Sequence, residues 1–98
     1  MLLIVCRLIM CTDITLVDYK SQTMIYQILK AFGQVVKEHR KRMGLSQEAF
    51  ADLCELHRTY LSGVERGLRN ISFENLEHIA CALNIPLSEL IKEAEDLA

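Results

Sequence analysis

The sequence predicts an all-α fold of five helices, and three observations lead to it. The chain has 98 residues, which is enough for one modest hydrophobic core. It contains 4 glycines and 1 proline, and its balance of 51% hydrophobic but only 6% aromatic residues favours helices packed through aliphatic side chains over a β-sandwich. From Met24 onward, apolar residues recur at steps of three and four, which is the helical period.

Residues 1–23 form an N-terminal extension that we separate from a domain at 24–98. Its first run, MLLIVCRLIMC, is apolar but too short to span a bilayer, and it lacks the basic start of a signal peptide. The next run, ITLVDY, is rich in β-branched residues, so the two runs could pair as a β-hairpin arm. The alternative is that translation starts at Met24, which would place residues 1–23 outside the protein.

The first helix is predicted from Met24 to a stop at Gly44, since glycine readily adopts the left-handed conformation that ends a helix. Cations gather in the last turns, where they interact favourably with the helix dipole. These cations are Lys37, Arg40, Lys41 and Arg42. The apolar stripe consists of Ile25, Ile28, Leu29, Phe32, Val35 and Val36.

Two short helices joined by a tight turn are expected next. Ser46 is a natural N-cap for the first of them, whose apolar face carries Phe50 and Leu53. The pattern breaks near residues 54–56, and the second helix then runs through HRTYLSGVER and ends at Gly67. Two short helices separated by a three-residue turn have the outline of a helix-turn-helix.

Two further helices complete the predicted domain. Ser72 caps one that ends at Asn84, a residue type that tolerates the left-handed conformation. Pro86 stands in the first turn of the last helix, where a missing N–H is tolerated. The apolar positions are Leu76, Ile79, Ala80 and Leu83 in the former, and Leu87, Leu90, Ile91 and Ala94 in the latter.

The charge of the chain is polarised, although its formal net charge is only −2. Residues 31–70 carry seven Lys or Arg against five Asp or Glu, a local net charge of +2. Residues 71–98 carry one Lys against six acids, a local net charge of −5. One end of the molecule is therefore suited to an anionic partner, and the other end is repelled by it.

The outer side of the helix that ends at Gly67 has an unusual composition. Leu61 and Val64, with Tyr60, can face the core, which leaves an opposite stripe of Arg58, Thr59, Ser62 and Gly63. One cation among small side chains permits close approach to a surface, and the DNA major groove accepts one α-helix. Arg58 can donate two parallel hydrogen bonds to guanine O6 and N7. The alternative is an ordinary solvated helix face.

The stretch GLSQEAFADLCELHRTYLSGVERGLRNIS resembles the helix-turn-helix of the phage Cro and repressor family. Its LHRTYLSGVERG run, followed by RNIS, is most similar to the controller proteins of restriction-modification systems. The resemblance covers residues 32 to about 92, and it rests on Gln47, Ala51, Leu61, Val64 and the Glu-Arg-Gly of 65–67. It implies a five-helix repressor-like domain that regulates transcription, with autoregulation and timing of a restriction endonuclease gene.

The resemblance also implies roles for individual residues. Gln47 would contact the DNA backbone, while Arg58 and Thr59 would read base edges with Ser62 and Gly63 lying against them. Candidates for phosphate contacts, which fix register without reading sequence, are Tyr60, Arg66, Arg69 and Asn70. Arg69 entering a groove is the alternative for that residue. In related repressors the positions of Arg40 and Glu65 form an ion pair between the first and third helices.

Glu55 departs from the family pattern, which usually has glycine at this position of the turn. A non-glycine residue in a left-handed conformation costs roughly 1 kcal/mol. Either the turn has another geometry, or the domain tolerates the strain.

A single recognition helix touches few base pairs, so helix-turn-helix proteins usually bind palindromic operators as two-fold dimers. We therefore expect a homodimer on double-stranded DNA. The predicted interface is the apolar side of the last helix, comprising Leu87, Leu90, Ile91 and Ala94, to which residues 1–19 could contribute. The alternative is that these side chains only close the core of the monomer.

Neither catalysis nor a metal site is indicated by the sequence. It has no Ser/His/Asp grouping or glycine-rich phosphate loop, and its histidines lie far apart at 39, 57 and 78. The cysteines at 6, 11, 54 and 81 form no C-x-x-C pair, and we expect them to be reduced core residues of a cytoplasmic protein. We expect no cofactor, small-molecule ligand or membrane partner.

A rival interpretation of the function is a protein-interaction module of the same fold, antitoxin-like or antirepressor-like. The acidic C-terminal end of the chain favours this interpretation.

Overall fold

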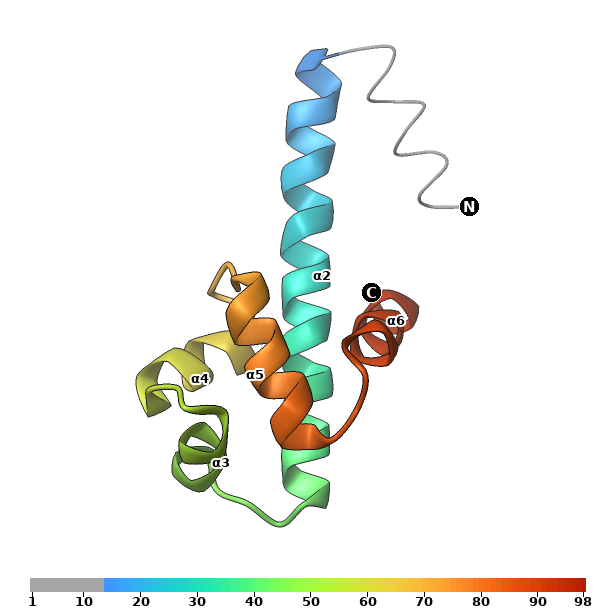
Figure 1. Ribbon diagram of the computed structural model, residues 1–98. Helices are drawn as coiled ribbons and strands as arrows, with labels where there is room; N and C mark the ends of the chain where they lie inside the picture. The colour runs from blue at the N-terminus through green and yellow to red at the C-terminus, as the bar shows by residue number, and fades with distance from the viewer. Residues whose placement is uncertain (1–13) are drawn as a thin grey trace.

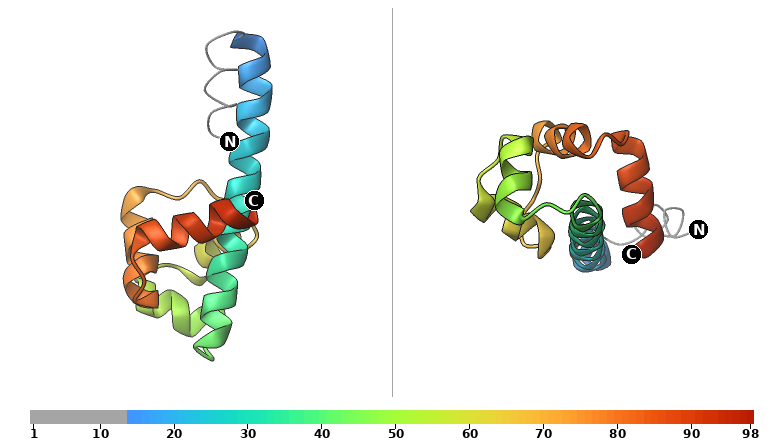
Figure 2. Two further views of the ribbon diagram at one scale, coloured as in Figure 1. Left: turned by 90° about the vertical axis from the view of Figure 1, so that its right-hand side faces the viewer. Right: turned by 90° about the horizontal axis from the view of Figure 1, so that it is seen from below.

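The computed structural model describes the backbone of residues 14–98 and the side chains of residues 24–98. Five helices and no strand occur in this part of the chain: α2 (Ile14–Arg42), α3 (Gln47–Cys54), α4 (Arg58–Glu65), α5 (Phe73–Leu83) and α6 (Leu87–Leu97). α2 forms a central axis, and the other four helices lie around its lower part (Figures 1 and 2). The predicted all-α class is therefore confirmed.

The first helix is longer than the sequence pattern indicated. α2 begins at Ile14 rather than at Met24, and its upper part rises above the other helices (Figure 1). The ITLVDY run is helical, so the predicted β-hairpin arm is wrong for this run; the other run lies outside the described residues. Extending an existing helix costs little once its nucleus has formed, and this outweighs the weak β-preference of branched side chains. The domain boundary at residue 24 remains a prediction.

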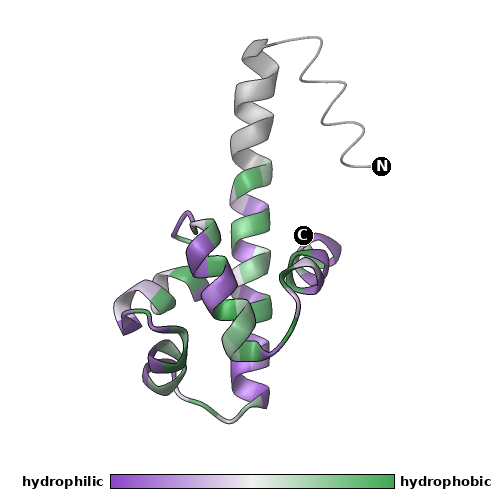
Figure 3. Cartoon of the chain, viewed as in Figure 1, coloured by the Kyte–Doolittle hydropathy of each residue, from purple (hydrophilic) through white to green (hydrophobic). Residues whose placement is uncertain are grey.

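The hydrophobic core collects side chains from all five helices. Those that are almost fully buried, with the largest volumes, are Phe50, Leu61, Ile79, Leu90, Val36, Val64 and Cys54. Burying a side chain of this kind stabilises the fold by about 1.5–3 kcal/mol relative to leaving it exposed. Hydrophobic and hydrophilic residues alternate along the coloured, lower part of α2 in Figure 3, and the last turn is hydrophilic where the cations gather.

α6 closes the core instead of presenting an apolar side to solvent. Leu90 and Ala94 are 0% exposed, so both belong to the core of one chain and cannot line a surface between two copies. The predicted dimer interface is wrong for these two residues. Leu87 and Ile91 are half-buried and pack against the same core. The reason is that α2 needs an apolar cover on the side away from α3 and α4, and α6 provides it.

Two glycines fix the end of α4 against α2. A Cβ atom on Gly33 would lie 2.2 Å from the carbonyl oxygen of Val64. A Cβ atom on Gly67 would lie 2.7 Å from Cα of Lys30. Only hydrogen in place of a side chain permits these approaches, because the opposing atoms belong to the backbone. These two contacts fix the position of the end of α4 along the axis of α2.

The predicted helix caps are present. The Ser46 hydroxyl accepts a hydrogen bond from the backbone N–H of Ala49 at 3.1 Å, and the Ser72 hydroxyl accepts one from Asn75 at 3.2 Å. Asn84 ends α5 in the left-handed conformation, with φ 57°. Each cap satisfies backbone groups that a helix end would leave without partners.

Glu55 ends α3 in the same left-handed conformation, with φ 57°. The domain thus tolerates the strain that the sequence indicated. Glu55→Gly is expected to raise the free energy of unfolding in urea by about 0.5–1 kcal/mol, since glycine adopts this conformation without a Cβ clash. Asn84→Gly is the control and should gain less, because asparagine already tolerates it. A lower stability for Glu55→Gly would show that the glutamate side chain contributes more than the strain costs.

Candidate nucleic-acid interface

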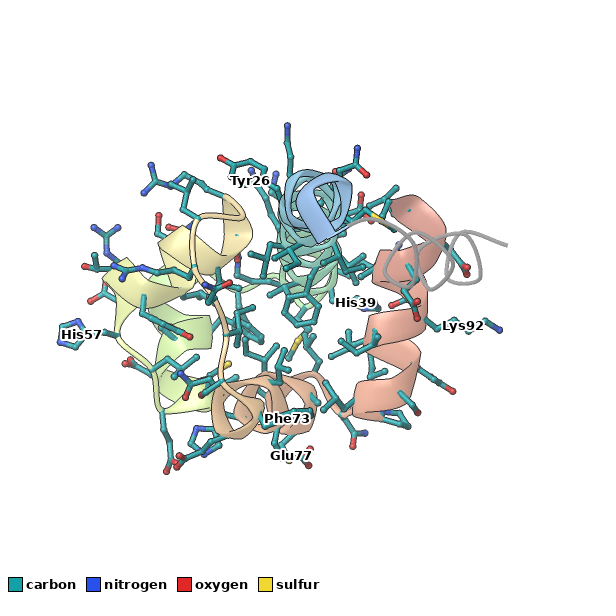
Figure 4. All side chains as sticks on the ribbon, turned by 90° about the horizontal axis from the view of Figure 1, so that it is seen from above. Tyr26, His39, His57, Phe73, Glu77 and Lys92 are labelled. Carbon is teal, nitrogen blue, oxygen red and sulfur yellow. The ribbon has the colours of Figure 1, made fainter. Side chains whose placement is uncertain are left out.

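α3, the turn at residues 55–57 and α4 form the helix-turn-helix (Figure 1). Leu61 and Val64, which are 0% and 1% exposed, attach the inner side of α4 to the core. His57, directly before α4, points away from the rest of the molecule (Figure 4). Its side chain does not cap the helix, so it leaves the backbone N–H groups of the first turn of α4 accessible. α4 is therefore attached to the core along one side and turns its other side outward.

The outward side of α4 carries the stripe that the sequence indicated. Arg58 and Thr59 are exposed and Ser62 is half-buried. Arg66, Arg69 and Asn70 follow at the C-terminal end of the helix, and all three are exposed. A guanidinium group with small polar neighbours can reach base edges, while cations at the far end of the helix are suited to phosphate groups.

Gly63 has a different role from the expected one. It is buried, because the side chain of Arg69 lies over it: a Cβ atom on Gly63 would lie 2.8 Å from Cγ and 3.0 Å from Nε of Arg69. The Arg69 guanidinium carbon lies 5.8 Å from the centre of the Tyr60 ring, within the range of a cation–π contact. Gly63 therefore admits Arg69 to the surface of α4 and does not itself lie on that surface. Nothing in the sequence pattern, apart from the residue types themselves, predicts that Arg69 packs on Gly63.

A buried polar cluster joins α2, α3 and α4 beneath this surface. Arg40 Nε donates to Glu65 Oε2 at 2.7 Å and Arg40 Nη2 donates to Glu65 Oε1 at 3.1 Å, a bidentate ion pair. The two residues are only 8% and 7% exposed. Arg40 Nη1 also donates to the carbonyl oxygen of Leu45 at 2.8 Å. The structure thus brings together the pair that the resemblance implied, and the pair fixes α4 to α2.

Gln47, at the first position of α3, is the third member of the cluster. Its Nε2 donates to Glu65 Oε1 at 2.9 Å, and its side chain is half-buried. A glutamine side chain has a second N–H and a carbonyl oxygen, which this hydrogen bond leaves for another partner. Sequence reasoning assigned Gln47 to the DNA backbone but missed its bond to Glu65, which orients the amide.

The cysteines of residues 24–98 do not form a reactive centre. Cys54 is buried, and burial raises the pKa of its thiol to about 11, so it is protonated at neutral pH. Cys81 is exposed, against our expectation of a core residue, and its hydrogen bond to Glu77 raises the pKa of its thiol.

Residues 24–98 hold no group of three or more His, Cys, Asp or Glu placed to bind a metal ion. The described helices include none with the length and hydropathy of a membrane span.

Fold and site together define a helix-turn-helix protein. The profile of the helix-turn-helix family matches residues 36–90, and the chain belongs to this family. Within it, the chain is 44% identical over 69 residues to the control protein C.BamHI of Bacillus amyloliquefaciens, which covers 69% of this chain and 85% of the relative. It is 49% identical over 65 residues to the control protein C.MunI of a Mycoplasma species, covering 65% and 88% of the two chains. The chain is thus a member of the control-protein group.

Solved structures of this group share the fold. The restriction-modification controller protein C.AhdI from Aeromonas hydrophila superimposes with a TM-score of 0.61 at 50% sequence identity. The superposition covers 63% of this chain and 94% of C.AhdI. These relatives are named as control proteins, and others as transcriptional regulators, rather than as enzymes.

Proposed function

We propose that the protein binds operator DNA sequence-specifically through the outer side of α4 and regulates transcription as a homodimer. The observation that carries this proposal is the composition of that side: Arg58 and Thr59 are exposed on a helix whose inner side is fixed by the core. In this arrangement Arg58 reads a guanine by two hydrogen bonds and Thr59 contacts an adjacent base edge.

Phosphate contacts would surround these base contacts. Their candidates are the residues beside and beyond the stripe: Gln47, Tyr60, Arg66, Arg69 and Asn70. Glu65 holds the Gln47 amide, and Gly63 lets Arg69 lie along α4, so two of these side chains are positioned before DNA arrives. Contacts of this kind set register and supply affinity that does not depend on sequence.

The distribution of charge agrees with this orientation. The cations Arg58, Arg66 and Arg69 lie on or next to α4, whereas the acids of residues 71–98 lie on α5 and α6. Placed in a major groove, α4 would turn its cations toward DNA and keep most acids away from it. Two such domains would read half-sites of a palindrome about 34 Å apart.

The relatives suggest the genes that are controlled. C.AhdI and C.Esp1396I are named as restriction-modification controller proteins, and we infer the same role here. The operator would then lie upstream of the regulator's own gene, and its position relative to the promoter would decide between activation and repression. The protein would act in the cytoplasm without catalysis, metal or cofactor.

Salt dependence tests the DNA contacts directly. The logarithm of the binding constant is expected to fall linearly with the logarithm of the salt concentration. Arg66→Ala or Arg69→Ala should reduce the magnitude of the slope of this line by about 0.9 for each phosphate that is no longer neutralised. Lys92→Ala is the matched control, because Lys92 is an exposed cation of α6 on the opposite side of the molecule from His57 (Figure 4). Slopes that are equal for all three variants and the native protein would contradict the assignment and favour a protein partner.

A further inference from the structure

The backbone after α4 turns back onto the helix and brings residue 69 beside residue 63. Gly67 has φ 74°, and its N–H donates to the carbonyl oxygen of Val64 at 3.0 Å. The N–H of Leu68 donates to the carbonyl oxygen of Gly63 at 2.9 Å. These two hydrogen bonds form the Schellman motif, in which a left-handed glycine ends a helix. The side chain of Arg69, which follows the motif, therefore starts next to the last turn of α4.

Gly63 lies on the outward side of α4, and yet it is buried. It stands four residues after Thr59 and three before Arg66, a spacing that places the three residues on one side of the helix. Thr59 and Arg66 are exposed, whereas Gly63 is covered. The three heavy atoms nearest to a Cβ atom on Gly63, at 2.8, 3.0 and 3.4 Å, are Cγ, Nε and Cδ of Arg69. Arg69 thus occupies the place that a side chain at position 63 would take.

The ring of Tyr60 supports the far end of the Arg69 side chain. The guanidinium carbon lies 5.8 Å from the centre of the ring, within the range of a cation–π contact. The ring is held in its turn, because Tyr60 is half-buried and packs against the hydrophobic core. No hydrogen bond or ion pair holds this guanidinium within residues 24–98. A contact with the face of a ring therefore leaves the N–H donors of Arg69 for another partner.

We propose that Arg69 is a DNA contact assembled before DNA arrives, and that Gly63 and Tyr60 are its positioning residues. The missing side chain at position 63 makes room for the stem of the arginine, and the ring of Tyr60 supports its guanidinium. Tyr60 thereby acts on DNA binding through its ring rather than through its hydroxyl group. An arginine that is ordered in advance loses less conformational freedom on binding. The inference rests on the proposed function and gives two of its residues an indirect role.

Gly63→Ala is expected to change stability and DNA affinity in opposite directions. Alanine favours a helix more than glycine does, so the midpoint of thermal unfolding should rise by about 2–5 °C. The added Cβ atom displaces Arg69, so affinity for the upstream duplex should fall about threefold to tenfold for each half-site. Gly33→Ala is the contrast and should lower the unfolding midpoint, because its Cβ atom would meet backbone atoms. A fall in both quantities for Gly63→Ala, or native affinity, would overturn the inference.

Variants of Tyr60 separate its ring from its hydroxyl group. Tyr60→Leu removes the ring and should weaken DNA binding as much as Gly63→Ala does. Tyr60→Phe keeps the ring, so its loss should be smaller, about twofold for each half-site. Equal losses in the two variants would overturn the role of the ring. Leu68→Ala is the matched control and should keep native affinity, because Leu68 is exposed (56%) and adjacent to Arg69 in the chain.

A double-mutant cycle tests whether the positioning residues act through Arg69. In an Arg69→Ala background, Gly63→Ala and Tyr60→Leu should each change DNA affinity by less than about twofold, since the side chain that they position is gone. Losses as large as those in the native background would overturn the inference.

NMR spectroscopy of the isotope-labelled full chain measures the arrangement without DNA. The ring current of Tyr60 should shift the side-chain signals of Arg69, and this shift should vanish in Tyr60→Leu and Gly63→Ala but persist in Tyr60→Phe. Arg66 is the internal control, because within the described part of the chain its guanidinium lies over no aromatic ring. Arg69 signals that are the same in the native protein and Tyr60→Leu overturn the inference. The expected shifts in a protein that binds neither duplex would support the positioning of Arg69 and contradict only the proposed function.

Discussion

Glu65→Ala is expected to lower the free energy of unfolding by about 3–5 kcal/mol, the cost of leaving the other member of a buried ion pair without its partner. Arg40 is 8% exposed and donates to both carboxylate oxygens of Glu65. Alanine would leave that guanidinium buried with one remaining bond, to the Leu45 carbonyl. Gln47 would lose its acceptor at the same time. Urea denaturation followed by circular dichroism measures the change.

Two further variants identify the cause of that loss. Glu65→Gln keeps one acceptor oxygen but removes the charge, so we expect an intermediate loss. Replacing both members together, as Arg40→Met with Glu65→Leu, removes the buried charges and should recover most of the stability. A Glu65→Ala variant within about 0.5 kcal/mol of native stability, the usual range for surface substitutions, would show that the pair does not hold α4 to α2.

Arg58→Ala is expected to remove most of the preference for the operator while leaving the fold intact. Loss of a bidentate arginine–guanine pair costs about 1–3 kcal/mol of discrimination, and a dimer loses it in both half-sites. Arg58 is exposed at the start of α4, so its removal should not change the thermal unfolding temperature. Competition between operator and scrambled duplexes at fixed salt measures the preference.

Arg58→Lys is the matched control for charge. Lysine retains the cation but lacks the planar pair of donors, so the variant should keep its affinity for scrambled DNA and still lose preference. Equal preference in the native protein, Arg58→Ala and Arg58→Lys would assign base reading to other side chains.

Local features of the fold were predictable because local chemistry determines them. Ser46 and Ser72 cap their helices, and Asn84 ends α5, because short polar side chains satisfy or tolerate the backbone geometry at helix ends. Leu61 and Val64 face inward because the helical period places them on one side. The exposure of Arg58 and Thr59 follows from the same period.

Features that depend on tertiary contacts were not predictable in this way. The apolar side of α6 has the same pattern whether it covers α2 or a second copy, and only the packing shows that Leu90 and Ala94 are buried within one chain. Arg69 reaches Gly63 because the chain turns back after Gly67. Cys81 was expected in the core, since a hydrophobic residue type alone indicates burial, and it is exposed.

The central claim is that α4 reads a DNA sequence, and one measurement tests it most directly. It is the fluorescence anisotropy of the native protein titrated onto the duplex upstream of its own gene and onto a scrambled duplex, over a series of salt concentrations. We predict that the upstream duplex binds about 10³-fold or more tightly than the scrambled one, and that both affinities fall with salt. Weak binding that is equal for the two duplexes would contradict the claim.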